Sequence, residues 1–78
     1  MEQYTLTCLG EGQWAKVTDI KLEGGMRRRL QDLGLVQGTP VQCIQKSPWG
    51  DPIAFLIRGA AIALRTEDAG GVHVMPIG

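Results

Sequence analysis

The most constraining feature of the chain is a proline-marked loop followed by two short apolar runs. Two prolines and a glycine lie within residues 48–52, an apolar run covers residues 53–58, and a second covers residues 61–64. Side chains that alternate with period two on both sides of a glycine are typical of a β-hairpin. We therefore predict two antiparallel strands joined by a two-residue turn, Gly59 and Ala60, with Gly at its first central position.

Three further segments are rich in β-forming residues and predict strands. They cover residues 14–20, 41–46 and 72–75. Ile44 breaks the alternation directly after Cys43, so a β-bulge or a strong bend is expected there.

Two segments predict helical structure, and a third predicts a short lead-in. Residues 26–33 carry apolar side chains three and four positions apart, which places them on one face of a helix. Gly34 is expected to end this helix in the left-handed conformation, with Leu35 packing back against it. Residues 66–69 predict one helical turn with its first residue, Thr66, as N-cap. A weak alternation over residues 4–7 predicts a short strand or an extended lead-in.

The predicted elements together indicate a mainly β fold. Many short strands separated by Gly-containing turns favour a sandwich or a barrel. Five strands with one short inserted helix and one helical turn, in a chain of 78 residues, favour the barrel because closure limits exposed edges. No linker or repeat interrupts the sequence, so we expect residues 1–78 to form a single domain.

Charge and hydropathy exclude several function classes. Lys plus Arg and Asp plus Glu both total 8, so the formal net charge is zero, which argues against nucleic acid as the main partner. The first residues lack the basic and apolar regions of a signal peptide. Every apolar run is far too short to span a bilayer. We expect a cytoplasmic protein that reaches a membrane only through a partner, and its oligomeric state stays open.

The chain offers little that resembles a catalytic apparatus. It holds one histidine, His73, and two cysteines, Cys8 and Cys43. No nucleophile elbow, phosphate-binding loop or paired metal-ligand spacing accompanies them. We therefore predict no enzyme and no cofactor, and we expect both thiols to be small buried hydrophobic residues. Cys8, Cys43 and His73 stay weak candidates for a divalent transition metal, held within one copy or between two copies.

Three consecutive arginines on the predicted helix suggest a charged surface. They fan out around the helix, because successive residues are about 100° apart. Arg29 flanks the apolar face, so its guanidinium is expected to bind backbone or a carboxylate. Arg27 and Arg28 are expected to form either a solvated face or a cationic docking point for an acidic protein surface.

The two tryptophans have different predicted roles. Trp14 begins a predicted strand and is expected in the core. Trp49 stands at a loop tip, where it is either a lid over the barrel end or an exposed binding anchor. We expect Arg27, Arg28, Trp49 and Asp51 to line a partner-binding surface at one end of the barrel.

Three motifs, in this order and spacing, resemble the FeoA family of bacterial ferrous iron transport. They are RLxDLGLxxG over residues 29–38, PxGDPI over residues 48–53 and RGxxIALRxxxA over residues 58–69. The resemblance extends from about Leu6 to Val74. It covers nearly the whole chain.

The resemblance carries expectations of its own about fold and partner. It implies an SH3-like barrel and an accessory role on the membrane transporter FeoB, whose cytoplasmic part is a GTP-binding domain. The same domain occurs at the C-terminus of iron-dependent repressors. The alternative function is therefore a transition-metal-binding protein or a metal sensor.

Overall fold

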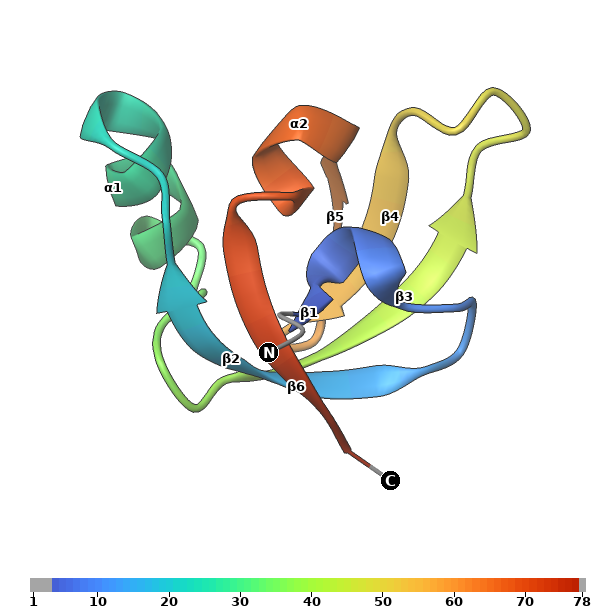
Figure 1. Ribbon diagram of the computed structural model, residues 1–78, viewed down its shortest axis with the longest axis horizontal. Helices are drawn as coiled ribbons and strands as arrows, with labels where there is room; N and C mark the ends of the chain where they lie inside the picture. The colour runs from blue at the N-terminus through green and yellow to red at the C-terminus, as the bar shows by residue number, and fades with distance from the viewer. Residues whose placement is uncertain (1–3, 78) are drawn as a thin grey trace.

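Within residues 4–77, which the computed structural model describes, six antiparallel strands form one bent sheet (Figure 1). The spatial order of the strands is β1-β6-β2-β3-β4-β5. The sheet curls so that its inner face encloses the core, which confirms the predicted mainly β architecture. The strands are β1 (Tyr4–Thr5), β2 (Trp14–Ile20), β3 (Pro40–Lys46), β4 (Ile53–Ile57), β5 (Ala60–Leu64) and β6 (Val72–Ile77).

Short helical segments connect the strands at one end of the sheet (Figure 1). They are the 3-10 helix η1 (Leu6–Cys8), α1 (Gly24–Asp32) and α2 (Thr66–Ala69). Both predicted helices and the five longer strands lie where the sequence indicates them. The N-terminal lead-in contains both a strand and a helical turn, because β1 gives way to η1.

Alternation along the strands builds the core. In β4, Ile53, Phe55 and Ile57 are buried, while the residues between them are only partly covered. Trp14 was expected in this core, but it is 38% exposed. It lies on the outer face of β2 because its neighbour Ala15 occupies the inner face. The buried apolar residues are Leu6, Leu9, Ala15, Val17, Ile20, Leu30, Leu35, Val41, Cys43, Ile53, Phe55, Ile57, Leu64, Ala69, Val72 and Val74.

The predicted bulge in β3 is confirmed. The register of β3 against β4 shifts between Cys43 and Gln45. The extra residue, Ile44, is turned outward and is 41% exposed. A second register shift, in β2 between Val17 and Asp19, carries no comparable signal in the sequence.

Helix α1 ends as predicted, in a two-hydrogen-bond glycine motif. Gly34 has φ 103°, its amide donates to the carbonyl of Gln31, and the Leu35 amide donates to the carbonyl of Leu30. Thr39 stabilises the same corner, since its hydroxyl donates to the Gly34 carbonyl over 2.8 Å.

The hairpin turn lies one residue earlier than predicted. Ile57 pairs with Ala60, so the central residues of the turn are Arg58 and Gly59. Both have positive φ, 49° and 81°, as a type I′ turn requires, and this turn matches the twist of the strands. The Arg58 side chain reaches the end of α1, where its Nε donates to the Gly34 carbonyl over 3.2 Å. This contact explains how a non-glycine residue is held in the left-handed region.

The glycine at the end of α1 allows a matched test of the fold. Replacing Gly34 by alanine should lower the free energy of unfolding by about 1–2 kcal/mol or more. The left-handed backbone disfavours a Cβ, and that Cβ would clash with Arg58 Cδ. Gly25→Ala is the control, because nothing lies within 4 Å of its Cβ position and its φ is not positive. It should be neutral or stabilising by about 0.5–1 kcal/mol in urea unfolding. Equal effects of the two substitutions would contradict this account.

Candidate functional site

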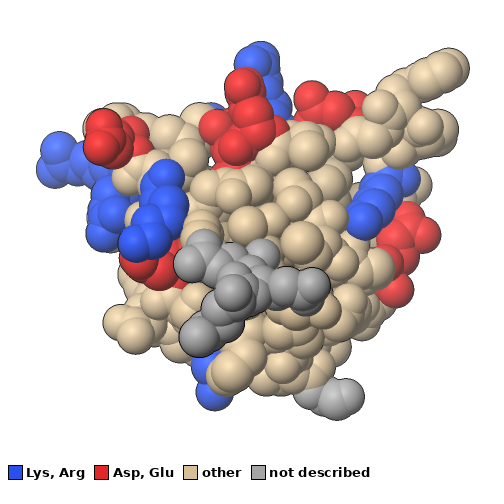
Figure 2. All heavy atoms as spheres, in the orientation of Figure 1, with Lys and Arg blue, Asp and Glu red and all other residues tan. Residues whose placement is uncertain are grey.

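The loop between β3 and β4 holds a tryptophan in solvent. Trp49 is 90% exposed, which excludes the lid over the barrel end. Its use as a binding anchor stays a prediction. Its amide faces the Ser47 hydroxyl at 3.3 Å, and the Gly50 amide donates to the Ser47 carbonyl over 2.8 Å. The loop projects from the body of the molecule as an uncharged knob at the upper right of Figure 2.

This loop is tied to the start of α2. The Asp51 carboxylate accepts a hydrogen bond from the Thr66 amide over 2.9 Å. In return, the Thr66 hydroxyl donates to the Gly50 carbonyl over 2.8 Å. Thr66 was predicted as the N-cap of α2, but Arg65 holds that position, and Asp51 supplies the capping carboxylate from another element. A negative charge is favourable at this end of a helix.

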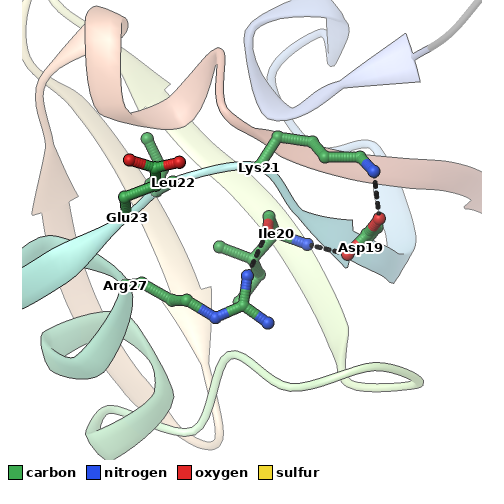
Figure 3. A pocket seen from close by; sticks show the side chains of 6 residues that line it. All are labelled: Asp19, Ile20, Lys21, Leu22, Glu23 and Arg27. Carbon is green, nitrogen blue, oxygen red and sulfur yellow. Dashed lines mark hydrogen bonds and ion pairs between the residues drawn. The ribbon is translucent and has the colours of Figure 1, made fainter.

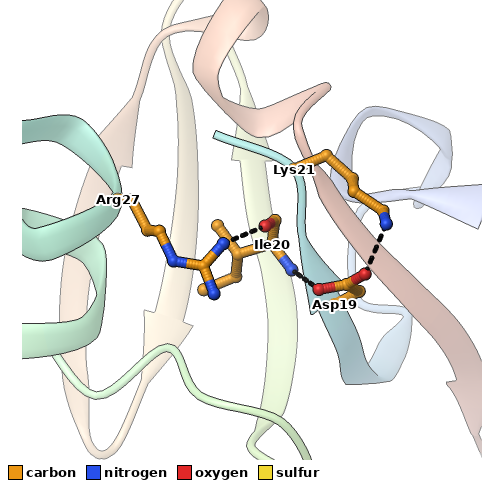
Figure 4. Close-up of polar contacts among 4 residues, drawn as sticks. All are labelled: Asp19, Ile20, Lys21 and Arg27. Atoms are coloured by element: carbon orange, nitrogen blue, oxygen red, sulfur yellow. Dashed lines mark hydrogen bonds and ion pairs between the residues drawn. The ribbon is translucent and has the colours of Figure 1, made fainter. Parts of the chain in front are cut away.

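Arg27 links two elements at the same end of the barrel, on the side of α1. Its Nη1 donates to the Ile20 carbonyl over 2.7 Å and so joins α1 to the end of β2 (Figure 4). The sequence pattern predicts a contact of this kind, to backbone or to a carboxylate, for Arg29 instead. The Arg29 side chain has no hydrogen bond or ion pair to another residue of the described range. Arg27 is the residue whose position, one turn from the helix start, reaches back to β2.

A charged hollow of about 280 Å³ surrounds this contact (Figure 3). Asp19 lies at its edge, where Oδ2 accepts from Lys21 Nζ over 2.7 Å and Oδ1 accepts from the Ile20 amide over 2.8 Å. The hydrogen bond from Lys21, followed by that from Ile20, lowers the pKa of Asp19. The hollow is lined by charges of both signs, of which Asp19 and Lys21 form an ion pair while Arg27 bonds to a backbone carbonyl.

The four predicted partner-binding residues divide into two groups. Arg27 and the exposed Arg28 belong to α1, while Trp49 and Asp51 belong to the β3–β4 loop. In Figure 1 these two elements stand at the same end of the barrel, on opposite sides of α2. Lys and Arg side chains gather over the α1 side in Figure 2.

Two grooves lie between these groups. One, of about 350 Å³, is bounded by α1, β5 and α2. The other, of about 270 Å³, is lined by the loop prolines Pro48 and Pro52 together with Ala54 and Ala63. Ala63 of β5 borders both grooves, so the β5 surface connects the loop to the helix side.

The candidate metal ligands differ in accessibility. Cys43 is completely buried, and burial raises its pKa. Cys8 was expected to be buried too, but it is exposed, since η1 turns it outward. A hydrogen bond from the backbone of Thr5 lowers its pKa. His73 is partly buried in β6. Across residues 4–77, no three His, Cys, Asp or Glu side chains group closely enough to hold a metal ion.

The two thiols should react very differently in the folded protein. At neutral pH, iodoacetamide should modify Cys8 alone, because the thiolate is the nucleophile and only Cys8 is accessible. The pH midpoint of this reaction should lie below that of an ordinary thiol, in line with its lowered pKa. Mass spectrometry after timed alkylation measures both effects. The Cys8→Ser variant should stay unmodified until urea unfolds it, and rapid native modification of Cys43 would contradict the buried core.

Comparison with known proteins decides the family. Residues 4–76 match the FeoA domain family. The chain belongs to the FeoA family. It is also 30% identical over 69 residues to an Fe(2+) transport protein A/Fe(2+) transporter FeoB fusion protein of Porphyromonas gingivalis. That match covers 88% of this chain and only 8% of the length of the fusion protein.

Solved FeoA structures confirm the SH3-like fold. The solution structure of FeoA from Chlorobium tepidum is 36% identical, with a TM-score of 0.91, covering 96% of this chain and 71% of that one. FeoA of Stenotrophomonas maltophilia, described as a prokaryotic SH3 domain protein and complexed with zinc, is 32% identical with a TM-score of 0.81, covering 91% and 88%. A manganese-dependent transcriptional repressor, 18% identical with a TM-score of 0.87, shares the fold over 99% of this chain and 38% of its own.

Two features of this surface escaped sequence reasoning. The role of Thr66 depends on Asp51, fifteen residues earlier, and only the fold brings the two together. The place of Ala63 between two grooves likewise cannot be predicted from a run of small apolar residues.

Within the described part of the chain, no helix is both long and apolar enough to cross a membrane.

Proposed function

We propose that this FeoA-family protein is a non-enzymatic accessory of ferrous iron uptake, docking from the cytoplasm on the GTPase region of a FeoB-type transporter. The observation that carries the proposal is the fusion relative, in which a FeoA protein and the transporter FeoB form one chain. Covalent linkage raises the effective concentration of two modules that bind each other. The surface of the FeoA domain is therefore where contact with the transporter is expected.

The surface of the protein supports binding better than catalysis. Trp49 is a large aromatic side chain, almost wholly exposed, on a loop held at its base by Asp51 and Thr66. Because the loop is already ordered, docking loses little conformational entropy. Tryptophan is also among the residues that most often carry interface energy.

The cationic side of the surface adds a second element to the proposal. Arg28 is exposed on α1, and Arg27 uses one guanidinium nitrogen on the Ile20 carbonyl. Arg28 is therefore the better candidate for an acidic surface of the transporter, while Arg27 also holds α1 in place. Charge complementarity of this kind favours rapid association and correct orientation.

Truncation of the exposed tryptophan tests the docking role. Trp49→Ala should weaken binding to the purified soluble region of FeoB by at least about tenfold, the loss expected of an interface anchor. The measurement is biolayer interferometry at fixed salt. Unfolding stability should not change, because the side chain makes few contacts within the protein.

Met75→Ala is the matched control for this experiment. Met75 is also a large apolar side chain, 53% exposed, but it lies on β6. Its loss should leave binding unchanged. If both variants bind like the unaltered protein, Trp49 is not part of the interface, and if the unaltered protein does not bind, the docking role itself is wrong.

A metal-binding role is the second candidate. The observation in its favour is the Stenotrophomonas maltophilia FeoA, which was solved in complex with zinc. In the present chain Cys8 is exposed and His73 is partly buried, whereas Cys43 faces the core. Since no three such ligands meet among residues 4–77, any tight site needs side chains from a second copy.

Titration with ferrous ion separates the two candidates. Anaerobic calorimetry should show no saturable binding in the micromolar range, because residues 4–77 of one copy hold no converging ligand set. Micromolar or tighter binding that is lost in Cys8→Ser or His73→Ala would instead favour the metal-binding role. Cys43→Ala should behave differently from both, since it removes a core side chain and lowers stability.

A further inference from the structure

Strand β5 is an open edge of the sheet. It pairs with β4 alone, and it lies at one end of the strand order while β1 lies at the other. β1 is a two-residue strand followed directly by η1, so that edge is protected by its shortness. β5 has five residues, from Ala60 to Leu64.

The register of the hairpin shows which backbone groups of β5 are free. Ile57 and Ala60 flank a two-residue turn, so they form a hydrogen-bonded pair, and hydrogen-bonded pairs recur at every second residue. The amides and carbonyls of Ala61 and Ala63 therefore point away from β4. Within residues 4–77, no hydrogen bond outside the strand ladder involves these groups.

β5 lacks the usual devices that block edge pairing. Its sequence has no lysine, no proline and no other charge, and its register against β4 has no shift. Natural sheets normally use such devices on exposed edges of this length. The exposed side chains are Ala60, Ala61 and Ala63, which are small enough to allow another backbone to approach.

A groove runs beside this edge. It is the hollow of about 350 Å³ between α1 and α2, to which β5 contributes Ala63 and Leu64. α1 stands on the side of β5 away from β4 in Figure 1 and contributes Met26 and Arg29. The residues that follow β5 add charges of both signs to the groove, Arg65, Glu67 and Asp68. The groove thus combines Met26 with a mixed set of charges, among them the Arg29 guanidinium, which has no ion pair among the described residues.

We propose that β5 binds an extended segment of the transporter's cytoplasmic region by strand addition. The segment pairs with Ala61 and Ala63 through its backbone and packs an apolar side chain on the partly buried Met26. This mode obtains affinity from main-chain hydrogen bonds and specificity from alternate side chains. The inference rests on the proposed docking function, and it names the surface and the conformation of the bound partner.

Proline at position 63 tests the edge without breaking the hairpin. Ala63→Pro removes only an amide that points away from β4, and proline is tolerated on such an edge. Ala63→Val is the matched control, because it adds a side chain of similar size and keeps the amide. Biolayer interferometry should show about tenfold weaker binding of the soluble FeoB region to Ala63→Pro, and near-normal binding to Ala63→Val. Circular dichroism should show both variants folded.

Hydrogen exchange by NMR gives a readout that does not depend on any variant. In the free protein the amides of Ala61 and Ala63 should exchange fast, while those of Ile62 and Leu64 are protected. Adding the soluble FeoB region should protect Ala61 and Ala63. Binding by the unaltered protein without this protection, or equal binding by Ala63→Pro, overturns strand addition and leaves the docking role intact. No binding at all overturns both.

The same edge could instead pair with a second copy of the chain, and sedimentation distinguishes this case. Three results together would show that the occupant is another copy and that our assignment is wrong. The unaltered protein dimerises, Ala63→Pro is monomeric, and Ala63→Pro binds the transporter region as well as the unaltered protein does. A monomer at all concentrations, with Ala61 and Ala63 protected only in the complex, supports our assignment.

Discussion

Burial of one shared apolar surface by every strand is the constraint on which the structure depends. A chain of 78 residues buries only about 60% of its unfolded surface, so no strand can leave its inner face uncovered. Phe55 and its neighbours fill this space completely. The hollows described above lie on the outside of the barrel, beside its loops, helices and strand edges. These outer features are the ones on which the proposed docking depends.

The outer surface is shaped by a few polar contacts that link distant elements. Arg27 holds α1 to the end of β2, Arg58 reaches the same helix from the hairpin turn, and Asp51 holds the β3–β4 loop to α2 through Thr66. The first of these contacts is only partly buried and the other two are exposed, so each contributes little to stability by itself. Their effect is to fix where the loop and the helix stand. A fixed arrangement binds a partner at lower entropic cost than a mobile one.

The sequence predicts the parts of this fold that depend on local rules. Period-two alternation identifies β4, a broken alternation identifies the bulge at Cys43, and a glycine after an apolar helix identifies the end of α1. It fails where a tertiary contact overrides the local rule. Trp14 is a different case, because the alternation itself places it on the outer face once Ala15 occupies the inner one. The turn lies at Arg58 because the pairing of β4 with β5 runs from Ile53 and Leu64 to Ile57 and Ala60, and this register cannot be read from the turn residues alone. The pairing of Asp51 with Thr66 also needs the fold, since nothing local joins residues that far apart.

The two edges of the sheet differ in how well they are protected against pairing with another strand. A strand at an edge exposes backbone donors and acceptors, and a small neutral protein is at particular risk of pairing through them. Selection against aggregation would favour a charge or a proline at Ala61 or Ala63, since either change costs little at positions whose amides face solvent. β5 contains neither. An unprotected edge beside an ordered groove is better explained if the edge is covered in the working assembly, because the partner then removes the exposed backbone that would otherwise be a liability.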